Sequence, residues 1–242
     1  MNKRKGKAFQ MKIIAANWKM NTSPQEGLVL AEDLKRIENI EYDIVIFPPH
    51  THLSILSYAL EDSQIMVGAQ DCHHETNGAF TGDVSAAMLE GCECTHVILG
   101  HSKRREYHNE TDEIIKEKAH QALKYYILPI ICVGESKEER ESGKYLDKIL
   151  QQVEQSTPNR GDYIIAYEPI WAIGSGKTPS VEEIDEVHSA IKENHGDHQV
   201  IYGGSVNEVN YKDIITQENV DGLLVGSASL SIEKFSTIIT NG

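Results

Sequence analysis

The segment Ile164-Ile-Ala-Tyr-Glu-Pro-Ile-Trp-Ala-Ile-Gly-Ser-Gly176 decides how this chain of 242 residues is interpreted. Its apolar first part predicts a short buried strand that ends at Glu168. Pro169 stops that strand, because proline has no backbone N–H for the ladder and a fixed φ. Gly174 would let a backbone amide approach a ligand closely. A carboxylate at a strand end beneath an apolar flap suits a general base, since exclusion of water strengthens it.

The alternative interpretation of this segment is a buried strand end followed by an ordinary turn. That would be the better reading of an isolated Glu-Pro pair. Because eleven consecutive residues, 166–176, share this character, we favour a catalytic acid or base carried into a glycine-tipped lid.

Apolar runs of strand length recur eight times along the chain, and segments with helical periodicity separate them. The runs are Ile13–Trp18, Tyr42–Phe47, Ile65–Ala69, His96–Leu99, Ile127–Cys132, Tyr163–Tyr167, Gln199–Tyr202 and Gly222–Val225. Two of the helical segments begin with a capping box, at Ser23 and at Ser180. Continuously apolar strands that alternate with helices indicate a parallel sheet, and eight such units close into a barrel. An open doubly wound sheet is the alternative, but no G-x-G-x-x-G follows the first strand. We therefore predict a fold of the α/β class, a single (β/α)8 TIM barrel over residues 11–242.

The composition limits the partners that this chain can have. A net charge of −14 argues against nucleic acid or an anionic membrane surface as the main partner. An anionic substrate must then be held by local donors against the overall field. No apolar run approaches the roughly 20 residues of a membrane span, so we expect no membrane partner.

The cysteines and the first ten residues indicate the cellular compartment of the protein. Cys72, Cys92, Cys94 and Cys132 have no disulfide-framework or zinc-finger spacing, which fits a reducing cytoplasm, and we predict no metal site. Residues 1–10 are basic but lack the apolar region of a secretory signal. We expect them to be a disordered basic extension, a start-site artefact or a remnant of cloning.

Unusual polar residues and glycines follow the ends of the predicted strands. In a barrel of this kind the carboxyl ends of the strands carry the chemistry. The segments concerned are Asn17 to Lys19 after the first strand, His101 after the fourth, Glu168 after the sixth, Gly203 to Ser205 after the seventh, and Gly226 with Ser227 after the eighth.

Lys19 and His101 are the two candidates for stabilising negative charge on a substrate. Asn17 and Lys19 would leave an extended segment on the same side, so that an amide and an ammonium could bind an anionic oxygen. A solvated lysine is the alternative for Lys19 alone. Ser102 could cap a helical turn whose dipole favours the neutral form of the His101 ring, although a lone loop histidine is usually structural.

Two glycine-containing loops predict a phosphate site. They are Tyr202-Gly-Gly-Ser205 and Leu224-Val-Gly-Ser-Ala228. Either would be an ordinary turn alone, but after strands seven and eight of a barrel such loops present backbone N–H groups to an anion.

Taken together, the motifs N-W-K-M-N, G-H-S-x-R-R, A-Y-E-P-I-W-A-I-G-x-G, Y-G-G-S and D-G-x-L-V-G-x-A-S resemble those of the triosephosphate isomerase family over residues 11–242. The resemblance implies interconversion of dihydroxyacetone phosphate and glyceraldehyde 3-phosphate in glycolysis and gluconeogenesis, without cofactor or metal. Glu168 would move a proton between C1 and C2 through an enediolate, and His101 would polarise the carbonyl as a neutral imidazole, as is established for this family. Lys19 and Asn17 would stabilise charge.

The resemblance also implies which groups surround the reacting atoms. Residues 169–179 would form a lid that closes over the phosphate. The phosphate would be bound by Gly174, Ser205, Gly226 and Ser227. Cys132 would lie beside the base.

The family forms dimers through a protruding loop, and residues 70–85 of this chain are similar to it. The apolar tip of Gly78-Ala-Phe-Thr-Gly82 would fit a pocket on a partner. Thr81 would then reach the neighbouring active site, while Asp83 and Arg104 would pair across the interface. We therefore expect a homodimer.

Four positions depart from the family pattern. Lys103 replaces a glutamate that contacts the catalytic lysine, so it could repel Lys19, favour its uncharged form or swing away. Ser227 replaces a glycine and would be strained if a positive φ were required. Pro179 lacks the N–H that often meets the tyrosine corresponding to Tyr202. Asp83 shortens the usual glutamate of the interface pair.

These departures keep a second hypothesis open. We predict an active isomerase with some loss of rate, due mainly to Lys103. The alternative is a divergent paralogue that binds a triose or related sugar phosphate with weak or no turnover. Retention of Asn17, Lys19, His101 and Glu168 argues against it, because binding alone needs no general base.

Overall fold

The chain folds around a closed barrel of eight parallel strands, as a computed structural model of residues 11–173 and 178–240 shows. Every strand pairs with its neighbour in sequence, and the first strand also pairs with the last. The strands are β1 (Ile13–Asn17), β2 (Asp43–Phe47), β3 (Met66–Ala69), β4 (His96–Leu99), β5 (Leu128–Val133), β6 (Ile164–Tyr167), β7 (Gln199–Tyr202) and β8 (Gly222–Val225). The predicted TIM barrel is thus confirmed, and no predicted strand end is displaced by more than one residue.

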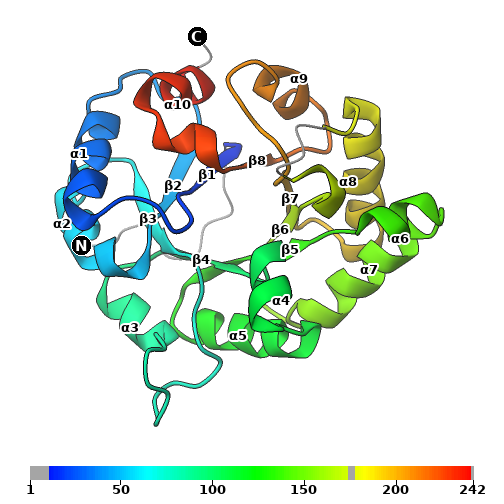
Figure 1. Ribbon diagram of the computed structural model, residues 1–242, viewed down its shortest axis with the longest axis horizontal. Coiled ribbons are helices and arrows are strands. Elements are labelled where there is room, and N and C mark those ends of the chain that lie inside the picture. Colours follow the sequence, from blue (N-terminus) through cyan, green and yellow to red (C-terminus); the bar gives the residue numbers. More distant parts are fainter. Residues whose placement is uncertain (1–10, 174–177, 241–242) are drawn as a thin grey trace.

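Helices surround the barrel on all sides (Figure 1). The α-helices are α1 (Pro24–Lys35), α2 (Leu53–Ala59), α3 (Ala86–Gly91), α4 (Ser102–His108), α5 (Asp112–Lys124), α6 (Lys137–Glu141), α7 (Tyr145–Ser156), α8 (Val181–His195), α9 (Tyr211–Ile215) and α10 (Ile232–Ile239). The short 3-10 helices η1 (His50–His52), η2 (Ile170–Ala172) and η3 (Ser227–Leu230) follow strands β2, β6 and β8.

Local sequence explains where several of these helices begin. Ser23 and Ser180 form the predicted capping boxes with Glu26 and Glu183. Ser136 forms a third one, at the start of α6. Each box satisfies backbone N–H groups that a helix start leaves without partners, so α1, α6 and α8 begin at fixed positions after their strands.

The strands are apolar on both faces because each face has its own core. Alternate residues point into the barrel, as Ile13 and Ala15 do in β1, and their neighbours Ile14 and Ala16 pack under the helices. Trp18 is fully buried in the outer layer. Because both faces of each strand are buried, the strand sequences are continuous apolar runs.

The amino-terminal side of the barrel is fastened by Lys12. Its ammonium donates hydrogen bonds to the carbonyl oxygens of Ile215, Gln217 and Val220, at 2.6, 3.2 and 2.7 Å. These carbonyls belong to the last residue of α9 and to the connection from α9 to β8, so Lys12 ties the chain before β1 to the chain before β8.

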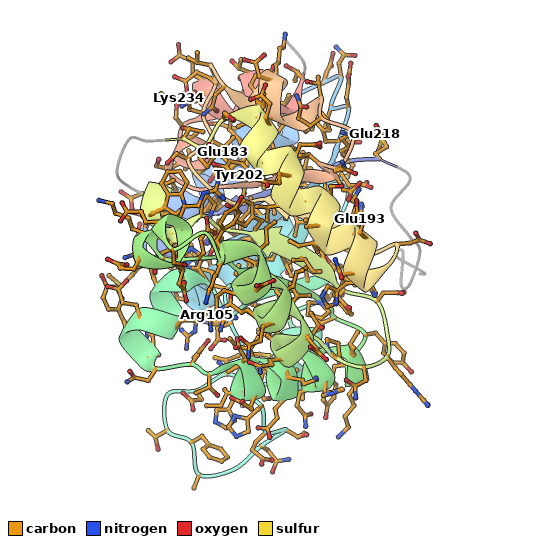
Figure 2. All side chains as sticks on the ribbon, turned by 90° about the vertical axis from the view of Figure 1, so that its right-hand side faces the viewer. Arg105, Glu183, Glu193, Tyr202, Glu218 and Lys234 are labelled. Carbon is orange, nitrogen blue, oxygen red and sulfur yellow. The ribbon has the colours of Figure 1, made fainter. Side chains whose placement is uncertain are left out.

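The segment between β3 and α3 extends away from the barrel (Figures 1 and 2). It contains residues 70–85, the predicted interface loop. The predicted basic extension, residues 1–10, and Gly174 lie outside the described residues. Within the described ranges, none of the helices combines the length and the apolar character that crossing a membrane requires.

Candidate active site

Glu168 stands directly after β6 and is almost fully buried, with 2% of the residue exposed. Its backbone N–H donates to the Val133 carbonyl at 2.7 Å, which extends the pairing of β5 and β6 by one residue. Gly134 packs against the Glu168 carbonyl so closely that a Cβ there would overlap it. The absence of a side chain at Gly134 therefore allows the two strand ends to meet.

The Glu168 carboxylate points at the start of α4. Its Oε2 accepts the Ser102 N–H at 2.9 Å, and its Oε1 lies 3.2 Å from His101 Nε2. The sulfur of Cys132 belongs to the same buried environment. Burial raises the pKa of the Cys132 thiol well above its ordinary value, and the charge of Glu168 raises it further. Cys132 is thus a neutral group beside Glu168.

His101 has a defined tautomer because it is the residue that caps α4. Its Nδ1 accepts the Lys103 N–H at 3.1 Å, so the proton of the neutral ring resides on Nε2, facing Glu168. The prediction that Ser102 is the cap was wrong. The Ser102 hydroxyl is buried without a hydrogen-bond partner among the described residues, and it is the backbone of Ser102 that binds the carboxylate.

Asn17 and Lys19 reach the site through a sharp turn, so the expected extended segment was also wrong. Lys19 has a left-handed φ of 53°, and its N–H binds Asn17 Oδ1 at 3.0 Å. Gln70 holds the same turn by donating to the Lys19 carbonyl at 2.7 Å. Among residues 11–173 and 178–240, the Asn17 amide nitrogen donates no hydrogen bond.

The Lys19 ammonium lies at the entrance to the barrel. Its Nζ is 3.7 Å from the point that a Cβ on Gly226 would occupy, so it stands beside the β8 loop. Among residues 11–173 and 178–240, no carboxylate is within ion-pair distance of Lys19. Its charge is available for an anionic ligand.

The two predicted phosphate loops flank Lys19 and Glu168. Gly203 donates its N–H to the Tyr167 carbonyl at 2.8 Å, which places the β7 loop beside Glu168. The Ser205 hydroxyl donates to the Ala172 carbonyl of η2 at 3.2 Å. Ser227 begins η3 without a positive φ, so the strain considered for this residue does not arise.

Tyr202 carries a buried hydroxyl without a hydrogen-bond partner among the described residues. Burial raises its pKa. Tyr202 is the last residue of β7 and is fully buried, and Figure 2 labels it beside the upper part of helix α8. Pro179 is buried as well and has no N–H to offer, in agreement with the expectation drawn from the sequence.

Lys103 points away from the site. Its ammonium binds the Glu106 carboxylate at 2.7 Å and lies 5.3 Å from the centre of the Tyr107 ring. The hydrogen bond to Glu106 raises the pKa of Lys103. Of the three outcomes considered for this residue, the structure shows that it swings away from Lys19.

Glu135 is a buried carboxylate beside the candidate site that the sequence analysis did not assign. It is fully buried, and its Oε1 accepts the Tyr167 hydroxyl at 3.1 Å and the Trp171 Nε1–H at 2.8 Å. Its carbonyl accepts the Ile170 N–H at 3.1 Å. Glu135 therefore holds the chain just before and just after Glu168. Glu135 follows the carboxyl end of β5 by two residues, and this position was the signal that could have identified it.

The predicted interface residues lie outside this cluster. Thr81 is exposed at the tip of the protruding loop, and Asp83 lies 3.4 Å from His73 Nε2. Arg104 pairs within the chain, with Asp71 at 2.9 Å and with Glu110 at 2.7 Å. The pairing of Asp83 with Arg104 across an interface stays a prediction.

Comparisons with known proteins point to one family. Residues 12–242 match a family model described as triosephosphate isomerase. The chain is similar to a triosephosphate isomerase of Porphyromonas gingivalis, 42% identical over 94% of this chain and 97% of that protein. It is 40% identical to one from Thermus thermophilus, over the same shares of the two chains. The crystal structure of triosephosphate isomerase from Bartonella henselae matches with a TM-score of 0.87 at 36% identity, and the match covers 94% of this chain and 97% of that one.

Proposed function

Because the chain belongs to the triosephosphate isomerase family, we infer that it is an isomerase that interconverts dihydroxyacetone phosphate and D-glyceraldehyde 3-phosphate. One observation carries this inference beyond family membership. The Glu168 carboxylate and the protonated nitrogen of a neutral His101 face each other at 3.2 Å, at the mouth of a barrel that also presents Lys19.

We propose that Glu168 removes a proton from C1 of dihydroxyacetone phosphate while His101 Nε2–H donates to the C2 oxygen. The electron pair of the C–H bond becomes the double bond of an enediol or enediolate. Glu168 then returns its proton to C2, and the proton on the C1 oxygen passes back to His101, so nothing is gained or lost overall. Lys19 and the Asn17 amide stabilise the negative charge that develops on the oxygens.

We propose that the substrate phosphate lies between the β7 and β8 loops. Backbone N–H groups of Ser205, Gly226 and Ser227, with that of Gly174 in the segment outside the described residues, would bind it. Lys19, next to Gly226, supplies the positive charge. These local donors are needed, because a protein with a net charge of −14 repels a dianion at long range.

We propose a homodimer joined through residues 70–85. Three exposed apolar side chains support it: Met20 beside Lys19, Phe80 in the loop, and Met88 on α3. Thr81 would reach the partner's active site. A cytoplasmic location and a role in glycolysis and gluconeogenesis complete the proposal, and the four free cysteines fit a reducing compartment.

A coupled assay of glyceraldehyde 3-phosphate isomerisation tests the proposal, together with a Glu168→Gln variant. The amide cannot accept the proton, so kcat should fall by about a thousandfold or more while 2-phosphoglycolate still binds. Glu193→Gln, an exposed site on α8, is the control and should leave kcat unchanged. Tight phosphoglycolate binding without turnover by the unmodified protein would instead support the non-catalytic paralogue.

A further inference from the structure

Arg140 is the positive charge that stands beside the buried Glu135. Its Nη1 is 3.6 Å from Glu135 Oε1, too far for a hydrogen bond, and its Nη2 binds Glu183 at 2.7 Å. The guanidinium carbon also lies 5.8 Å from the centre of the Trp171 ring. Arg140 thus touches the two partners, Glu135 and Trp171, whose hydrogen bond holds the chain after Glu168.

Arg140 is not held in this place by Glu135 alone. The 3.6 Å contact between Arg140 Nη1 and Glu135 Oε1 is not a hydrogen bond, so it restrains the orientation of the guanidinium only weakly. Glu183 is 43% exposed, so water competes for its carboxylate. An arginine restrained only by these two groups would keep much of its rotamer freedom.

Tyr145 supplies the missing restraint. The guanidinium carbon lies 3.9 Å from the centre of the Tyr145 ring, which is the close stacking that a planar cation forms on an aromatic face. The Tyr145 hydroxyl in turn donates to Glu186 at 2.7 Å. Tyr145 is the first residue of α7, and Glu186 lies one turn after Glu183 at the amino-terminal end of α8, which Figure 2 shows in front.

We propose that Tyr145 is a positioning residue for the reaction, which it serves by holding Arg140 against Glu135 and so fixing the segment that carries Glu168. The order of contacts is Glu186, Tyr145, Arg140, Glu135, and then the residues on both sides of the base. This inference rests on the proposed isomerase function. It assigns a role in the chemistry to a side chain that touches neither substrate nor reacting atoms.

The test compares three variants of the full chain. Tyr145→Leu removes the ring face, and Tyr145→Phe keeps the face but loses the bond to Glu186. Tyr125→Leu is the matched control. Like Tyr145, Tyr125 is half-buried and its ring lies near a cation, since Lys124 Nζ is 5.7 Å from the ring centre, but it lies on another part of the surface. Tyr145→Gln replaces the leucine variant if that protein does not fold.

We expect Tyr145→Leu to lower kcat about tenfold, because a small displacement of a catalytic group has a large effect, with KM changed less than about twofold. Tyr145→Phe should stay within about twofold of the unmodified protein. Acrylamide quenching gives a second readout, since Trp18 is fully buried and the quenchable emission of the two tryptophans comes from Trp171. Quenching should increase in Tyr145→Leu alone.

Three results would overturn the proposal. They are a Tyr145→Leu kcat equal to that of Tyr125→Leu, equal losses in the phenylalanine and leucine variants, and unchanged Trp171 quenching. If the unmodified protein has no isomerase activity, the proposed function fails, while the quenching experiment still decides whether Tyr145 positions Trp171.

Discussion

Lys103 is one of the four positions at which the sequence departs from the family pattern. The Lys103 side chain leaves Lys19 without a carboxylate partner among the described residues and bonds to Glu106 instead. Within the part of the chain that the structure describes, the backbone turn of Lys19 is restrained by Asn17 and Gln70. The sequence analysis identified the substitution, but the direction of the side chain depended on Glu106, one turn along the same helix.

Lys103→Glu should raise kcat/KM, because a carboxylate near Lys19 would restrain the ammonium. We expect about a two- to fivefold increase, the effect of a half-exposed ion pair. Lys103→Gln, which removes the charge without adding a partner, is the control. Steady-state kinetics with an unchanged or lower kcat/KM for Lys103→Glu would contradict this explanation.

Two buried histidines should make the fold sensitive to acid. Burial lowers the pKa of His96 to about 3 and that of His188 to about 4. Because unfolded histidine binds a proton near pH 6.5, the stabilisation from the neutral rings is complete above that pH and is lost as the pH falls. Each histidine should then reduce the free energy of unfolding by about 2 kcal/mol at about pH 5.

Urea unfolding at about pH 7.5 and about pH 5 measures this loss. His188→Gln should show a smaller difference between the two pH values than the unmodified protein. An equal difference in both proteins would assign the acid sensitivity to the carboxylates.

Among the elements, helices and strands were more predictable than the loops that follow them. Apolar runs fixed all eight strands, because a strand buried on both faces needs no partner to be recognised. The capping residue of α4 was misassigned, because His101 can cap a helix as well as Ser102 and only the fold orients its ring. The turn at Lys19 could not be foreseen either, since it depends on Gln70 from the neighbourhood of another strand.

Lys12 tests how strongly one side chain can join two elements. Its three hydrogen bonds to carbonyls of the α9–β8 connection are only partly exposed to water. Lys12→Met should lower the free energy of unfolding by about 2 kcal/mol, since it leaves those carbonyls without their donor. Lys35→Met, which removes an exposed bond to Ala59, should cost less than about 0.5 kcal/mol in the same denaturation experiment.

At the scale of the whole molecule, the protruding segment is the feature that the barrel itself does not require. The Phe80 ring lies against the His73 ring, with 4.2 Å between the ring centres and a tilt of 34°, and still 44% of Phe80 is exposed. The sequence predicted a partner for this loop, but one chain cannot show which residues the partner contributes. Arg104 is already paired with Asp71 and Glu110, so the predicted pair with Asp83 of a second copy would have to form in addition to these two ion pairs.

Phe80→Asp should therefore convert the proposed dimer into a monomer, because a charge at the loop tip cannot enter an apolar pocket. Light scattering after gel filtration measures the mass, and activity should fall with it. Tyr58→Asp, at a residue on α2 that is 82% exposed, should leave both unchanged. An unmodified protein that is already monomeric would exclude the interface.

The pairing order of the barrel also bears on how the chain is made. Seven of the eight strand pairs join neighbours in sequence, but β1 must also pair with β8, whose last residue is Val225. During synthesis the growing chain can therefore add strands one after another. One edge of β1 stays unpaired until β8 has been synthesised. Closing so long a loop has a high entropic cost and exposes two apolar edges until it happens. The nascent barrel is thus vulnerable to aggregation until β8 has been synthesised and has paired with β1.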